Sequence, residues 1–493
     1  LVEERPADTE AAVELRRLYT EGGRQRDLVE LLRKLVDRAE SKDDRVKLRL
    51  DLAKLEETLG ERTQAADTYR DLLGEEPDHN EAVLALSELL EKDGRDEELA
   101  DLMSAQIARA KERGDTAAEL SLEVRLGQMF ETRLKDPDRA LQAFESVLSR
   151  EPKHEGALSA VARLNEERGD LAGAERALAA LVDLASGQAG VDLALRLADT
   201  RSKMGELSGE EAALRRAIGF DGEARKPRER LRELLSKDGR HADLAAAMVD
   251  EADFITQKHP DVVVAAPAPA APETRGSMRP AGASAPPPPP VAEPVAQVLK
   301  LLRGAADVHI KEREAPADAI PLLERAATLV PHDRELLLLL CDTLVKLSRE
   351  REAAVVLERI IASFGGRRTK ELSLYHHRLG QTLAKLGDRA AALEQFDMAF
   401  RIDPGSVSVL RDLGVLALET DDLDRAQKSF RALLLQRLDD ASGISKGEVF
   451  FYLGEISAKQ GDRTKAVQMF ERAVESEPNL ERAKSRLSEL KSS

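Results

Sequence analysis

The chain has 493 residues, of which 42% are hydrophobic but only 3% aromatic, and its net charge is −17. This length excludes a single compact domain and predicts several domains or one elongated array. The single cysteine, Cys341, excludes an intramolecular disulfide and any zinc site with several thiolates. The acidic excess falls in residues 1–258, and no basic stripe occurs, which argues against nucleic acid or an anionic membrane surface as a partner.

The first residues match a later turn of the chain. Pro6 and Leu15 align without a gap on Pro77 and Leu86, 71 residues further on. Proline at this point ends a helical hairpin elsewhere in the sequence, so Pro6 marks the end of a preceding hairpin. We therefore expect the polypeptide to be a fragment of a longer array.

Apolar residues recur at i, i+3, i+4 and i+7 in segments of 11–15 residues, which predicts amphipathic helices throughout the ordered parts. The breaks between segments are themselves periodic. Gly60 to Gly94, Gly205 to Gly239 and Gly387 to Asp421 each span 34 residues, the length of a helix-turn-helix repeat. We predict an all-α solenoid with about seven hairpins before residue 258 and about five after residue 295, closed by a cap helix.

A proline-rich stretch interrupts this pattern. Residues 260–294 contain 11 of the 21 prolines, and proline both removes backbone donors and clashes with the preceding helical turn. We predict an acidic N-terminal solenoid over 1–257, a Pro/Ala-rich flexible linker over 258–295, and a C-terminal solenoid over 296–493. A spacer is favoured over a ligand for a proline-recognition domain.

The repeat is clearest in the C-terminal half. Five residues recur at an interval of 74: Leu379, Gly380, Ala392, Phe396 and Pro404 return as Leu453, Gly454, Ala466, Phe470 and Pro478. Small residues let two helices approach closely, while the larger ones fill the space between them. This pattern resembles the tetratricopeptide repeat (TPR) family, Trp-x2-Leu-Gly-x2-Tyr followed by Ala-x3-Phe and Pro. The tryptophan of that pattern is replaced here, for example by His376 and Phe450.

Candidate catalytic patterns do not fit helical hairpins. Gly443-x-Ser445-x-Gly447 matches a nucleophile elbow, which requires a preceding strand, whereas the residues before it are helical in pattern. Adjacent histidines, His376 and His377, point about 100° apart on a helix and cannot share one metal ion. We expect no catalytic site, no metal and no cofactor.

The resemblance implies a concave groove lined by the first helices of successive hairpins. The positions that reach ligands in that family correspond here to the following residues: His377, Gln381, Lys385, Arg411, Val415, Phe451 and Glu455. Val415 and Phe451 indicate a partner surface, unless flanking side chains cover them; both readings stay open. The last segment, Leu480–Lys491, is expected to be a cap helix with Arg482 and Arg486 facing water.

These features predict a non-catalytic scaffold that binds peptides or helices of partner proteins. The alternative is an interaction region of a larger enzyme or signalling protein whose catalytic domain lies outside this sequence. None of the three asparagines falls at the groove position that a clamp for chaperone C-termini uses, so that ligand is not expected. The acidic N-terminal half favours basic segments, or its excess charge merely solvates an outer face. Composition suggests a bacterial protein, and we expect it in the cytoplasm.

Overall fold

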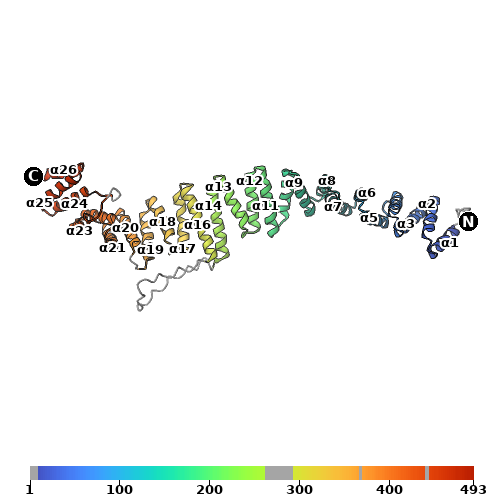
Figure 1. The fold of residues 1–493 in the computed structure, drawn as a ribbon, viewed down its shortest axis with the longest axis horizontal. Coiled ribbons are helices and arrows are strands. Elements are labelled where there is room, and N and C mark those ends of the chain that lie inside the picture. The colour runs from blue at the N-terminus through green and yellow to red at the C-terminus, as the bar shows by residue number, and fades with distance from the viewer. Residues whose placement is uncertain (1–8, 261–291, 366–368, 439–442, 493) are drawn as a thin grey trace, which may run out of the picture. The chain divides into compact units, whose positions relative to one another are not determined.

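The computed structural model describes residues 9–260, 292–365, 369–438 and 443–492 (Figure 1). All regular secondary structure in these residues is helical. Contacts divide the chain into two compact units, unit 1 (Leu1–Pro227) and unit 2 (Arg228–Ser493).

In unit 1 the helices form consecutive hairpins. They are α1 (Thr9–Glu21), α2 (Gln25–Arg38), α3 (Lys42–Thr58), α4 (Arg62–Glu75), α5 (Asn80–Lys92), α6 (Asp96–Arg113), α7 (Thr116–Thr132), α8 (Pro137–Arg150), α9 (Glu155–Arg168), α10 (Leu171–Leu184), α11 (Gly187–Met204) and α12 (Leu207–Phe220). Helix α13 (Arg225–Lys237) begins at the boundary between the units.

Unit 2 continues the same arrangement. Its helices are α14 (His241–Lys258), α16 (Glu293–Lys311), α17 (Pro316–Leu329), α18 (Arg334–Lys346), α19 (Glu350–Ala362), α20 (Lys370–Lys385), α21 (Arg389–Ile402), α22 (Val407–Glu419), α23 (Leu423–Leu433), α24 (Lys446–Lys459), α25 (Arg463–Ser476) and α26 (Glu481–Ser492). The described residues thus confirm the predicted seven hairpins, the five further hairpins and the cap helix.

The predicted breaks are the turns inside the hairpins. Gly387 has φ 85° and Asp421 has φ 58°, so both adopt the left-handed conformation that reverses the chain after a first helix. The repeat prolines end the second helices: α4, α8, α21 and α25 each stop two residues before Pro77, Pro152, Pro404 or Pro478.

Several hairpins close on a contact between a small residue and a large one. In five hairpins a glycine of the first helix faces a phenylalanine of the second, and a Cβ added to that glycine would lie 2.5–2.9 Å from the ring. The pairs are Gly127 with Phe144, Gly190 with Phe220, Gly380 with Phe396, Gly414 with Phe430, and Gly454 with Phe470. Carbon atoms normally approach to about 3.5–4.0 Å, so this contact requires glycine. The predicted role of the small residues is confirmed.

Helix α14 packs into the core of unit 2. Ala252 is fully buried in one apolar cluster with Val298 and Leu302 of α16. From α17, Arg325 lies 2.5 Å from the Asp253 carboxylate and donates a hydrogen bond to Thr256 Oγ1 at 3.2 Å. The division between units therefore falls before α14 rather than after it. The predicted linker lies largely outside the described residues, and the domain boundaries at 257 and 296 stay a prediction.

Candidate functional site

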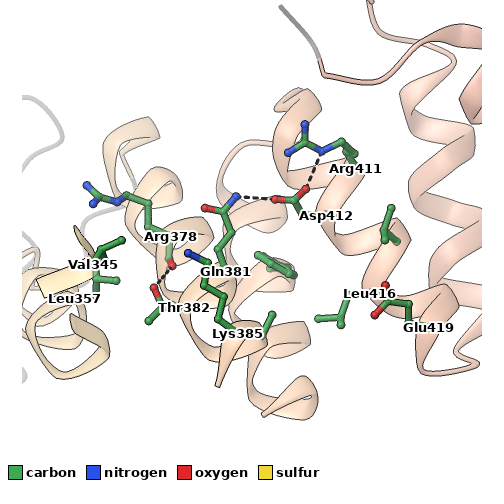
Figure 2. Close-up of a pocket in the computed structure, with 13 residues that line it drawn as sticks. Val345, Leu357, Arg378, Gln381, Thr382, Lys385, Arg411, Asp412, Leu416 and Glu419 are labelled. Atoms are coloured by element: carbon green, nitrogen blue, oxygen red, sulfur yellow. Dashed lines mark hydrogen bonds and ion pairs between the residues drawn. The ribbon is translucent and has the colours of Figure 1, made fainter. Parts of the chain in front are cut away.

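Unit 2 contains a partly open cavity of about 680 Å³ lined by three successive first helices, α18, α20 and α22, and by one residue each of the second helices α19 and α21. Its floor is apolar and its rim is polar. The floor comprises Val345, Leu357, Phe396, Val415 and Leu416, and the rim comprises Arg378, Gln381, Lys385, Arg411, Asp412 and Glu419. We call this space the groove cavity (Figure 2).

Helical spacing places the rim side chains together. On α20, Arg378, Gln381 and Lys385 are three and four residues apart and therefore share one face of the helix. On α22, Arg411, Val415 and Glu419 repeat at intervals of four. Figure 2 shows Gln381 of α20 reaching Asp412 of α22, with Arg411 beyond it. The two helices thus contribute facing walls.

A half-buried carboxylate, that of Asp412, joins these walls. Asp412 Oδ2 lies 2.8 Å from His377 Nε2 and accepts a hydrogen bond from Gln381 Nε2 at 2.7 Å, while Oδ1 accepts one from Arg411 Nε at 2.8 Å. Burial by itself would raise the pKa of Asp412, but the hydrogen bonds from His377, Arg411 and Gln381 outweigh it and lower the pKa to about 2. Asp412 is therefore ionised at neutral pH, and its charge is balanced within the protein.

The remaining rim charges differ in their partners. Arg378 pairs with Asp342 of α18, and Glu419 lies 3.9 Å from Arg389. Among the described residues, Lys385 has no ion-pair or hydrogen-bond partner, and its side chain is exposed. The groove cavity therefore combines an apolar floor with one unpaired cation.

The structure separates the seven groove residues named from the sequence into two groups. Gln381, Lys385, Arg411 and Val415 line the groove cavity. His377 is 5% exposed and lies behind the rim, where it contacts Asp412, and its ring centre lies 5.6 Å from that of Phe396 with the two planes tilted by 48°. Their role in ligand binding stays a prediction.

Phe451 and Glu455 lie on α24, away from the groove cavity, and contact the cap helix. The guanidinium of Arg482 lies 4.7 Å from the centre of the Phe451 ring, and Arg486 donates two hydrogen bonds to Glu455 at 2.6 and 3.2 Å. Arg482 and Arg486 keep about two fifths of their side-chain surface in solvent, 41% and 39%, but they also contact α24, which was not expected. Helix α26 lies where the first helix of a further hairpin would lie, so its arginines meet the preceding first helix.

Sequence reasoning missed Asp412, Arg378 and Phe396 as parts of this site. Phe396 was assigned to the hairpin core, and its ring also forms part of the floor. Asp412 carried a signal that could have been used: it follows His377 by 35 residues, about one repeat. A carboxylate and an imidazole one repeat apart lie on neighbouring helices.

The other candidate reactive groups serve structural roles. Ser445 is the N-cap of α24, where it forms a capping box with Glu448. Cys341 is fully buried, and burial raises the pKa of its thiol to about 11, so the thiol stays protonated. In the part of the chain that the structure describes, no cluster of three metal-ligating side chains occurs and no helix is long and apolar enough to cross a membrane.

Comparison with known proteins decides the family. Family models described as tetratricopeptide repeat match residues 50–110, 133–189, 312–369, 377–442 and 411–481, together more than half of the chain. The chain belongs to the tetratricopeptide repeat family. TPR membership supports a role as a protein-interaction scaffold. A bacterial source and a cytoplasmic location stay predictions.

Solved TPR structures resemble parts of the chain at low identity. YrrB, described as a TPR protein with an unusual peptide-binding site, is 21% identical and covers 39% of this chain and 89% of its own, with TM-score 0.30. MamA from Desulfovibrio magneticus RS-1 is 18% identical over 37% of this chain and 96% of its own, with TM-score 0.30. A chain of the APC/C hetero-tetramer Cut9–Hcn1 is 14% identical and covers 98% of this chain and 90% of its own, with TM-score 0.26. These scores carry no argument about function. A search of curated proteins found no match.

Proposed function

We propose that this TPR protein is a non-catalytic scaffold and that unit 2 binds a peptide segment of a partner protein in the groove cavity. The observation that carries the proposal is the position of that cavity across three successive hairpins, with a polar rim from the first helices and an apolar floor to which the second helices α19 and α21 also contribute. Its volume of about 680 Å³ falls within the usual range of ligand sites.

The floor supplies the binding energy in this proposal. Val415 is only half-buried, so an apolar side chain of the ligand would remove its remaining surface from water. Burying a leucine-sized side chain contributes roughly 1.5–3 kcal/mol. Ordering the peptide offsets part of this gain, so we expect modest affinity from the groove cavity alone.

The test begins with random 12-residue peptides displayed on phage and selected on the full chain. A selected peptide is then synthesised and titrated by calorimetry against the wild type, Val415→Asp and Leu435→Asp. Leu435 is 85% exposed and outside the groove cavity, so its substitution is a matched control. We expect Val415→Asp to weaken binding at least tenfold and Leu435→Asp to leave it within twofold. Failure to select any peptide, or equal binding to both variants, would refute the proposed site.

A further inference from the structure

We propose that the ligand of the groove cavity is a peptide in which an acidic side chain follows or precedes the apolar anchor, and that Lys385 binds its carboxylate. This inference rests on the proposed function and adds the chemistry of the partner. It is carried by the distribution of charge around the cavity, taken together with the apolar floor.

The rim contains three cations, two of which are already engaged. Arg378 pairs with Asp342, and Arg411 donates its Nε hydrogen to Asp412. Lys385 has no such partner in the described residues. An incoming carboxylate would therefore meet one cation whose attraction no protein carboxylate has cancelled.

A basic ligand finds no matching anion at this site. Both oxygens of Asp412 are occupied by hydrogen bonds from His377, Gln381 and Arg411. A ligand ammonium could reach Asp412 only by displacing one of these donors, which would leave a buried polar group unpaired. Glu419 already has Arg389 at 3.9 Å. The charge pattern thus selects acidic over basic peptides.

The position of Lys385 also favours a side-chain carboxylate over the carboxylate at the end of a chain. Lys385 is the last residue of α20, one turn beyond Gln381, and its ammonium is a single flexible point charge on the exposed rim. A terminal carboxylate is held best by several fixed donors that converge on it. A side chain that extends from an anchored peptide needs only one such contact.

The experiment uses a charge swap. A peptide from the selection described above is prepared with an amidated C-terminus in three forms, with Glu, Gln or Lys at its acidic position. Each form is titrated against wild type, Lys385→Glu and Lys428→Glu at 50 and 500 mM salt. Lys428 is an exposed lysine of α23 outside the groove cavity, so its substitution makes the same change in net charge elsewhere.

We expect Lys385→Glu to weaken the Glu peptide about tenfold at 50 mM salt and to strengthen the Lys peptide by a similar factor. The affinity of the Gln peptide for Lys385→Glu, and the affinities of all three peptides for Lys428→Glu, should differ less than twofold from those for the wild type. At 500 mM salt, the effects of Lys385→Glu on the Glu and Lys peptides should be smaller. If Lys385→Glu changed the affinity of all three peptides equally, the inference would be overturned and the proposed function would stand. The same would hold if the selected peptides shared no acidic residue. A free C-terminus that restores the Gln peptide would overturn the side-chain assignment. Loss of all peptide binding in wild type would count against the proposed function itself.

Discussion

The contact between Gly380 and Phe396 offers a quantitative test of how the hairpins are packed. A Cβ added to Gly380 would lie 2.5 Å from two ring carbons of Phe396 and 3.2 Å from the Ala392 carbonyl oxygen. The ring is 2% exposed and lines the groove cavity. Gly380→Ala must therefore displace the ring, or α20 relative to α21, by roughly 1 Å, since carbon atoms approach to about 3.5–4.0 Å.

The expected decrease in the local free energy of opening is the difference between two opposing effects of the substitution. Overpacking in a core costs about 1–3 kcal/mol, whereas alanine gains about 0.5–1 kcal/mol over glycine in a helix. Gly219→Ala in α12 isolates the second effect, because no atom lies within 4 Å of its added Cβ. We expect Gly380→Ala to lower the local free energy of opening by about 1–2 kcal/mol and Gly219→Ala to raise it slightly.

Hydrogen exchange measured by mass spectrometry can read both changes locally. Protection should fall in the peptides of α20 and α21 for Gly380→Ala and hold or rise in α11 and α12 for Gly219→Ala. Gly414→Ala, whose added Cβ would lie 2.9 Å from Phe430, should have a smaller effect than Gly380→Ala. An unchanged or increased protection of α20 in Gly380→Ala would refute the packing argument.

Other substitutions test single groups. Tyr69→Phe should stabilise unit 1 by up to about 1 kcal/mol in chemical denaturation, because within the described residues the buried Tyr69 hydroxyl makes no hydrogen bond of normal geometry and has at most a weak contact with Glu57. Arg150→Ala should destabilise unit 1 by about 3 kcal/mol, since Arg150 pairs at 2.7 and 2.8 Å with the buried carboxylates of Glu119 and Glu123; an unchanged denaturation midpoint would contradict this. As the pH falls from 5 to 2, the free energy of unfolding of the wild type should decrease by about 2 kcal/mol more than that of Asp412→Asn. The reason is that folding lowers the pKa of Asp412 to about 2, so the stabilisation by its carboxylate is present above pH 4 and is lost below it. A difference independent of pH would contradict this.

The fold could be predicted because its signals are local or recur at a fixed interval. Gly387 and Asp421 mark equivalent turns, and the spacing of Gly380 to Phe396 recurs in other hairpins. A packing contact that repeats with the chain can be recognised from the chain alone. The number of hairpins followed directly from counting these marks.

The details of the site could not be obtained in the same way. Asp412 acts through contacts with residues 31 and 35 positions earlier, and nothing in its own helix shows which neighbours supply them. Phe451 stands at a groove position of its repeat, yet Arg482 of α26 lies over its ring. The pattern of one repeat identifies which side chains point toward the concave side, whereas the adjacent repeats determine which of them remain accessible.

The helices on the two sides of the proline-rich segment, α14 and α16, pack against each other. In unit 1 the second helix of one hairpin is joined to the first helix of the next by a short turn, such as the two residues between α6 and α7. The helices α14 and α16 make the same kind of contact, with Ala252 fully buried against Val298, although the connection between them is much longer. In the sequence, the proline-rich segment therefore lies between two helices of the same compact unit.

It follows that cleavage of this segment should not separate the flanking helices. A protease site inserted after Ala271 and cut to completion should leave two fragments that elute together in gel filtration. Ala252→Arg, which places a charge in the α14–α16 core, should separate them after cleavage. Ala246→Arg, on the exposed side of α14, serves as the matched control and should not. Immediate separation of the wild-type fragments would instead support independent folding of residues 1–257 and 296–493, because the buried contact would then contribute too little to hold α14 in place.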